Sequence, residues 1–87
     1  MRVKSSPAGE AFASRVAAEV RAEMARQGVT QQALADRLGW PQSRLSRRIA
    51  LEGGKHKASP FDMRELGDVA DALGVSVMRL IPVEVPV

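Results

Sequence analysis

The densest set of hydrogen-bonding side chains in this chain lies between residues 42 and 47, where amide, hydroxyl and guanidinium groups follow one another. Such groups suit recognition of a fixed array of donors and acceptors. In the major groove of B-form DNA every base pair presents a distinct array, in which an amide pairs with adenine and a guanidinium bridges O6 and N7 of guanine. The residues that we expect to read base edges are Gln42, Ser43, Arg44, Ser46 and Arg47.

Two short helices joined by a tight corner are predicted to position these side chains. Thr30 is a suitable cap for the first helix, which runs to Leu38 and has Leu34 and Leu38 as its buried edge. Gly39 then supplies a residue that accepts positive φ at a helix end. Pro41 is tolerated at the start of the next helix, where its missing N–H would be unpaired in any case.

The second helix is predicted from Gln42 to about Leu51. Leu45 and Ile49 lie four residues apart on its buried side, which leaves the polar side chains on the outer surface. Trp40 lies in the corner between constraining Gly and Pro neighbours. We therefore expect its ring to be a packing wedge between the two helices rather than a platform for stacking bases.

The pattern T-Q-x-x-L-A-x-x-L-G-W-x-Q-S-x-L-S-R, from Thr30 to Arg47, resembles the helix-turn-helix of the lambda-repressor-like DNA-binding family of Cro and xenobiotic-response-element type. A looser similarity extends from about Ala11 to Ile81. The resemblance implies a compact all-α domain of five helices, with the helix Gln42–Leu51 in the major groove of double-stranded DNA. The positions that carry the resemblance are Gln31, Leu34, Ala35, Gly39, Leu45 and Ser46.

One departure concerns a buried ion pair. Many members of that family pair an Arg late in the first helix with a Glu near the end of the recognition helix, whereas this chain has Met24 and Ile49 at the corresponding positions. Replacing a buried ion pair by packed apolar side chains is often neutral or stabilising, so the departure does not argue against the fold.

Contacts to the DNA backbone are expected from helix N-termini and from cations beside the reading helix. Gln31 lies at the first of these N-termini. Lys55 and Lys57 lie in a polar loop that, by the resemblance, contacts phosphates. Arg48 neighbours Ile49 on the helical wheel, and the sequence leaves open whether it contacts a phosphate or forms a salt bridge.

Charge is distributed unevenly along the chain. Residues 1–57 carry eleven Lys or Arg against five Asp or Glu, whereas residues 58–87 carry two against five. The basic half contains the predicted corner, which indicates a polyanionic partner.

The flanking segments are predicted to support the corner. A long helix follows the Ser6–Pro7 cap and runs to about Gln27, and its core stripe is Phe12, Val16, Val20 and Met24. A fourth helix is expected from a Ser59 cap to Leu73, and a short fifth one after Ser76. The acidic residues of the fourth helix recur every three positions and are expected to form a solvated face that points away from DNA. They are Asp62, Glu65, Asp68 and Asp71.

The two ends of the chain are predicted to lie outside the helical core. Residues 1–5 form a mobile basic arm on a domain that spans residues 1–81. Residues 82–87, PVEVPV, form an extended tail that is either a dimerisation arm, a frayed end or the start of a linker.

Several classes of function are disfavoured. The 87 residues include no cysteine and a single histidine, His56, so neither a catalytic triad nor a metal cluster is indicated. The sequence therefore predicts no enzyme, cofactor, metal or small-molecule substrate. No signal peptide and no membrane span are evident, which favours a cytoplasmic protein. The resemblance to Cro-type regulators implies a bacterium or a phage-infected host cell as its setting.

We expect a transcriptional regulator, most simply a repressor of Cro or immunity-repressor type. One such helix reads too few base pairs for useful specificity, so a homodimer on a pseudo-palindromic operator is the leading hypothesis. The competing hypothesis is a protein-interaction module, such as an antitoxin or a phage accessory protein. An excision factor that bends DNA is a third.

Overall fold

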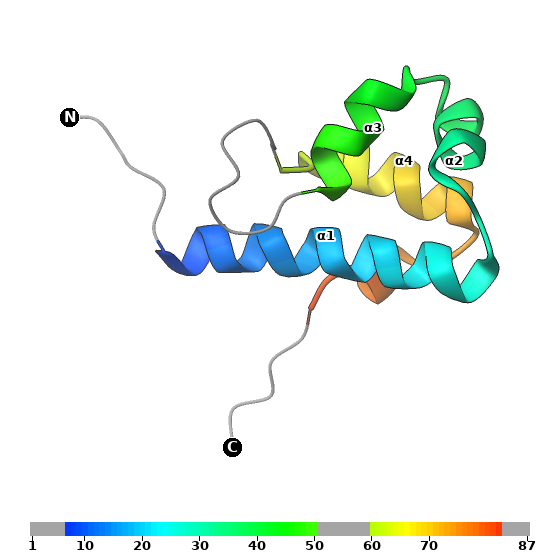
Figure 1. Ribbon diagram of the computed structural model, residues 1–87. Coiled ribbons are helices and arrows are strands. Elements are labelled where there is room, and N and C mark those ends of the chain that lie inside the picture. The colour runs from blue at the N-terminus through cyan, green and yellow to red at the C-terminus, as the bar shows by residue number, and fades with distance from the viewer. Residues whose placement is uncertain (1–6, 51–59, 83–87) are drawn as a thin grey trace.

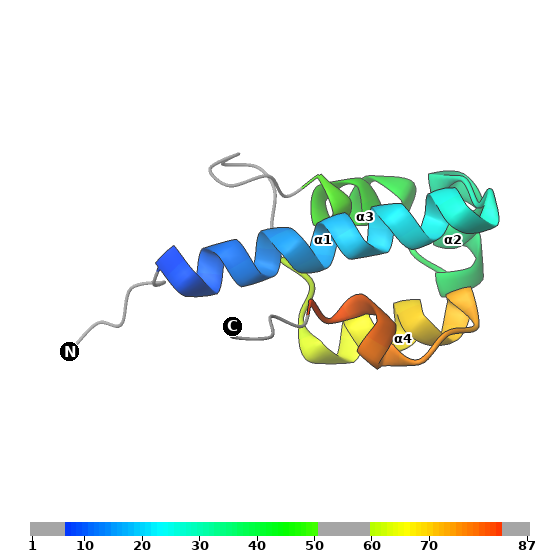
Figure 2. The same cartoon turned by 90° about the horizontal axis from the view of Figure 1, so that it is seen from below.

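The computed structural model describes residues 7–50 and 60–82. Over these ranges the chain forms four α-helices and one short 3-10 helix: α1 (Pro7–Gln27), α2 (Gln31–Leu38), α3 (Gln42–Ile49), α4 (Met63–Leu73) and η1 (Val77–Leu80). Helix α1 runs along the molecule, with α3 on one side of it and η1 on the other (Figure 1). The view from below in Figure 2 shows the same order. The all-α architecture predicted from the sequence is thus confirmed for the described residues.

The core forms where the apolar sides of the helices meet. It joins the middle of α1 to α2, α3 and α4, and Leu80 of η1 closes it. Burial at these positions follows the four-residue spacing of apolar side chains in each helix. The core residues are Val16, Val20, Met24, Leu34, Ala35, Leu45, Ile49, Leu66, Val69, Ala70, Leu73 and Leu80.

The predicted core stripe of α1 is wrong at one position. Val16, Val20 and Met24 are buried, whereas Phe12 remains 47% exposed. The Phe12 side chain borders an apolar hollow that residues of α4 and η1 also line.

The predicted start of α4 is also shifted. Its N-cap is Asp62, whose carboxylate accepts the Glu65 backbone N–H at 2.7 Å, while the Glu65 carboxylate accepts the Asp62 backbone N–H at 2.9 Å. This reciprocal capping box satisfies two backbone donors with ionised acceptors. Ser59, the predicted cap, lies outside the described residues.

The expected fifth α-helix is a single 3-10 turn. The Ser76 hydroxyl caps it by accepting the Met78 backbone N–H, as predicted. The turn ends at Ile81, which is extended at φ −94° and ψ 119°. Because Pro82 follows, Ile81 is disfavoured in the α conformation, and the helix cannot lengthen.

Three predictions fall outside the described residues. They concern the basic arm 1–5 with its Ser6 cap, the loop that contains Lys55, His56 and Lys57, and the tail beyond Pro82.

Gly39 and Gly67 provide a matched pair for testing the corner. A Cβ at either position would meet nothing within 4 Å, but Gly39 has φ +70° whereas Gly67 lies inside α4. We expect Gly39→Ala to lower the free energy of unfolding by about 1–2 kcal/mol because of the left-handed backbone. Gly67→Ala should raise it by about 0.5–1 kcal/mol, since alanine is the better helix former. Urea unfolding of both variants measures the difference, and equal effects would contradict the backbone explanation.

Candidate nucleic-acid interface

The corner between α2 and α3 is held by local hydrogen bonds. The Thr30 hydroxyl accepts the Ala33 backbone N–H at 3.1 Å and thereby caps α2. At the other end Gly39 adopts the left-handed conformation, and the Trp40 backbone N–H donates to the Ala35 carbonyl at 3.0 Å. Pro41 then precedes α3 in an extended conformation, with no side-chain cap. The Thr30 cap and the Gly39 helix end predicted from the sequence are both confirmed.

Helix α3 has a buried apolar side and an exposed polar side. Leu45 and Ile49 face the core and are buried. Ser43 and Arg47, one turn apart, are exposed on the outer side, and Gln42 is exposed at the first turn. Three of the five predicted base readers, Gln42, Ser43 and Arg47, are therefore exposed to solvent.

Ser46 lies on the side of α3 that faces α2. Its hydroxyl donates to Oε1 of Gln31 at 2.8 Å, so a predicted base reader and a predicted phosphate contact are brought together. Both side chains are half-buried. The hydrogen bond braces the two helices of the corner against each other.

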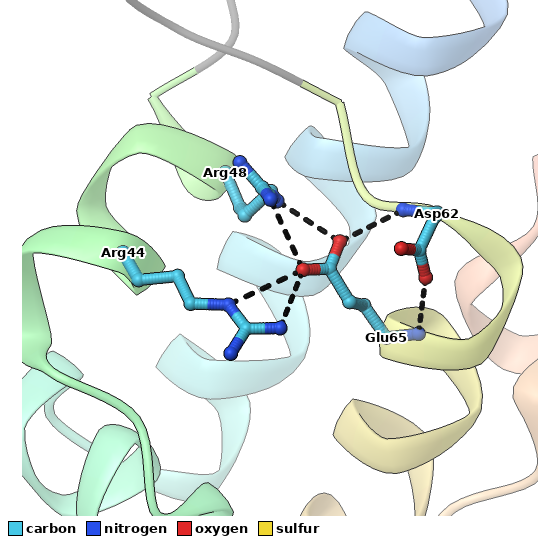
Figure 3. Close-up of polar contacts among 4 residues, drawn as sticks. All are labelled: Arg44, Arg48, Asp62 and Glu65. Atoms are coloured by element: carbon cyan, nitrogen blue, oxygen red, sulfur yellow. Dashed lines mark hydrogen bonds and ion pairs between the residues drawn. The ribbon is translucent and has the colours of Figure 1, made fainter.

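Arg44 and Arg48 lie on the opposite side of α3 and point at Glu65 of α4 (Figure 3). Arg44 donates through Nε at 3.3 Å and through Nη2 at 2.8 Å to Oε2 of Glu65. Arg48 donates through Nε to Oε1 at 2.9 Å and through Nη2 to Oε2 at 3.1 Å. Of the two roles left open for Arg48, the salt bridge is present.

The Glu65 carboxylate is thus the centre of a cluster that sequence reasoning missed. Its side chain is 4% exposed, against 40% for Arg44 and 20% for Arg48. The expectation of a solvated acidic face on α4 is wrong at this position, whereas Asp68 and Asp71 are exposed as predicted. The capping-box spacing of Asp62 and Glu65 was a visible signal, because it turns the Glu side chain back toward the helix start.

Trp40 contributes a second partner for Arg44. The Arg44 guanidinium carbon lies 4.0 Å from the centre of the Trp40 ring, within the range of a cation–π interaction. The Trp40 side chain is half-buried and packs against the core, as expected for a wedge in the corner. Arg44 is therefore held between an aromatic face and a carboxylate.

Helix α1 holds the far end of α3. The Arg21 guanidinium donates through Nη1 to the backbone carbonyl of Ile49, the last residue of α3. Carbonyl groups at a helix C-terminus lack partners within the helix, and a cation there also suits the helix dipole. Met24 and Ile49 are both buried, which confirms that apolar packing occupies these two positions.

The cluster also changes the acidity of Glu65. The hydrogen bonds from Arg48, together with those from the Asp62 backbone and Arg44, lower the pKa of this carboxyl from 4.5 to about 2, although burial opposes the shift. Glu23 of α1 behaves similarly. The hydrogen bonds from Arg26 and Gln27 lower its pKa to about 2.

Acid should therefore destabilise the fold. A carboxyl whose pKa is lower in the folded than in the unfolded chain stabilises the fold above the unfolded value. That stabilisation is lost as pH falls from about 4.5 toward 2, the two values that bound the Glu65 and Glu23 shifts. We expect the melting temperature to fall across this window. Glu65→Gln should lower the melting temperature at pH 7 and weaken its dependence on pH, and a slope identical to that of the unaltered protein would contradict the assignment.

Residues 7–50 and 60–82 contain neither a metal-site cluster nor a helix that could cross a membrane. Within these ranges no cluster of three or more His, Cys, Asp or Glu residues has the arrangement of a metal site. In the same ranges, no helix has both the length and the apolar character that crossing a membrane requires.

The comparison with known proteins agrees with the corner geometry. No curated protein and no solved structure matches the chain. A family model described as a helix-turn-helix domain matches residues 15–80, which extend from the middle of α1 to the end of η1. Because this match covers most of the 87 residues and includes α2, the corner and α3, the chain belongs to the helix-turn-helix domain family.

Proposed function

We propose that this protein binds double-stranded DNA sequence-specifically, with α3 in the major groove, and regulates transcription. The observation that carries the proposal is the exposed polar surface of α3, formed by Gln42, Ser43 and Arg47. The amide suits adenine and the guanidinium suits guanine, while the serine is short enough for close approach. Arg44 and Ser46 lie at the two edges of this surface, in contact with Glu65 and Gln31.

Backbone phosphates would be held around this surface. Gln31 lies at the N-terminus of α2, beside α3, where backbone N–H groups favour an anion. Lys55 and Lys57 follow α3 in the chain and stay predicted phosphate contacts, whereas Arg48 is paired with Glu65. The positive charge concentrated in residues 1–57 supports this orientation. The exposed Asp68 and Asp71 of α4 would then face away from the duplex.

The regulator is proposed to be a repressor of Cro or immunity-repressor type, acting as a homodimer on a pseudo-palindromic operator. A single α3 spans only a few base pairs, and two copies on adjacent half-sites would supply the missing specificity. The setting would be the cytoplasm of a bacterium or of a phage-infected cell. The protein would work by binding alone, without catalysis, cofactor or small-molecule substrate.

An apolar surface away from α3 supports self-association. Four large apolar side chains are exposed around a hollow of about 470 Å³ between α1, α4 and η1, and no residue of α3 lines this hollow. Exposed apolar patches of this kind mark interaction sites. The four side chains are Phe12, Met63, Val77 and Met78.

The same surface supports a second candidate function. If the hollow binds another protein, the chain is an interaction module such as an antitoxin or a phage accessory protein. An excision factor would use α3 as proposed but would also bend the duplex. Selection of bound duplexes from a random library separates these functions. An enriched, two-fold symmetric sequence supports the dimeric repressor, whereas a folded protein that enriches no sequence contradicts DNA reading by α3.

Arg47 and Lys57 should affect DNA binding differently. Arg47→Ala should cost about 1–3 kcal/mol of binding free energy at the selected site and relax the preference at one base position. Lys57→Ala should weaken binding to all duplexes alike and reduce the salt slope by about 1. Titrations of the selected site and a random duplex at two salt concentrations distinguish the effects. Identical behaviour of the two variants would contradict the separation of base reading from phosphate binding.

Met63 tests the proposed self-association. Its side chain is 91% exposed at the first turn of α4, where an acidic residue is well tolerated. Met63→Glu should keep the melting temperature of the monomer but shift the protein toward monomers in sedimentation equilibrium. It should also remove the preference for a full site over a half-site. The adjacent exposed residue provides the control, since Arg64→Glu adds the same side chain outside the hollow. An unchanged dimer in Met63→Glu would place the interface elsewhere.

A further inference from the structure

The three arginines of α3 occupy two different environments: two lie against a buried carboxylate and one is exposed. Arg44 and Arg48 are one helical turn apart and donate to the same carboxylate, that of Glu65. Arg47 lies between them in sequence but on the exposed side of the helix. The chemistry of the three side chains is identical, so their contacts alone distinguish them.

The Glu65 carboxylate is bound on both of its oxygens. Oε1 accepts from Arg48 and from the Asp62 backbone, and Oε2 accepts from both arginines. If either guanidinium turned outward to a base, it would break its hydrogen bonds to the Glu65 carboxylate, whose side chain is only 4% exposed. Removing a partner from a buried charge is strongly unfavourable, whereas Arg47 can reach a base without breaking such a pair.

We propose that Glu65 is a positioning residue of the DNA-binding surface, which withholds Arg44 and Arg48 from the bases and leaves Arg47 as the arginine of α3 that reads sequence. The inference rests on the proposed function, because it assigns roles within the same surface. It predicts different roles for Arg44, Arg47 and Arg48, although all three are basic residues of α3.

Charge explains why this division would increase specificity. Guanidinium groups released onto a DNA-facing surface bind any phosphate, and each phosphate neutralised makes the salt slope steeper by about 0.9 whatever the base sequence. One buried carboxylate between two arginines cancels part of their charge and fixes both side chains. Trp40 adds to the restraint, because its ring lies against the guanidinium of Arg44. Glu65 would thus suppress non-specific binding more than specific binding.

The first experiment replaces the carboxylate by its neutral isostere. Glu65→Gln should steepen the salt slope for a random-sequence duplex of about 20 base pairs by about 1 to 2, as one or both arginines gain phosphate contacts. Affinity for this duplex at low salt should rise, and the ratio of affinities for selected and random duplexes should fall. A residue with a purely structural role would lower the melting temperature but leave the salt slope unchanged.

Glu23 provides a matched control. Its side chain is 5% exposed and pairs with Arg26 and Arg79, so it is as buried and as ion-paired as that of Glu65. Neither of these arginines belongs to α3. Glu23→Gln should therefore lower stability in the same way without changing the salt slope or the affinity ratio.

A second experiment does not depend on Glu65→Gln folding. Arg44→Gln leaves Glu65 paired with Arg48 and with the Asp62 backbone N–H, so the fold should persist. Random-library selection with Arg44→Gln should enrich the same sequence as the unaltered protein. Selection with Arg47→Gln should change the preferred base at one position, because an amide pairs with adenine and a guanidinium with guanine.

The outcomes separate the inference from the function on which it rests. If the unaltered protein binds no duplex, the proposed function fails and the inference fails with it. If it binds DNA but Glu65→Gln has the salt slope of Glu23→Gln, the inference alone is overturned. A changed base preference in Arg44→Gln also overturns it, because Arg44 would then be a base reader.

Discussion

A buried carboxylate stays ionised only if hydrogen bonds and opposite charges replace the water it has lost. Glu65 meets this condition by accepting from two arginines of α3 and from the backbone at the start of α4. The same side chain therefore completes the cap of one helix and sets the orientation of another. Since α3 has only eight residues, it depends on such contacts with its neighbours for its stability and its direction. Arg21 at the end of α3, Gln31 beside its middle and the apolar residues beneath it complete the restraint.

These contacts leave one surface of α3 uncommitted to the fold. Polar groups that are not needed to hold the helices together remain exposed there, on Gln42, Ser43 and Arg47. A helix presented in this way, with its other sides fixed by the core, by α2 and by α4, can enter a groove without rearranging the domain. Preorganisation of this kind reduces the ordering cost of binding. The membership in the helix-turn-helix domain family and the exposed polar surface of α3 therefore both suggest DNA binding.

The remaining surface divides into parts with different chemistry. The outer side of α4 is acidic, whereas the region between α1, α4 and η1 is apolar and hollowed. Neither part contains a residue of α3. The described part of the chain thus has a polar surface on α3 and an apolar hollow between α1, α4 and η1.

The sequence alone determined the helices, the corner and most of the core, because these depend on local rules. Helix α2 begins after the Thr30 cap and ends at Gly39, which adopts the left-handed conformation. The four-residue spacing of apolar side chains selects the buried side of each helix. The start of α4 at Asp62 and the 3-10 form of η1 depart from those rules at the ends of elements, where a competing cap or a following proline decides. Phe12 departs from them inside α1, where it borders the hollow that α4 and η1 also line and stays partly exposed. Only the tertiary structure separated Arg44 and Arg48 from Arg47. Their partner Glu65 is at least seventeen residues away in the chain, and helical periodicity carries no information about which side of α3 meets α4.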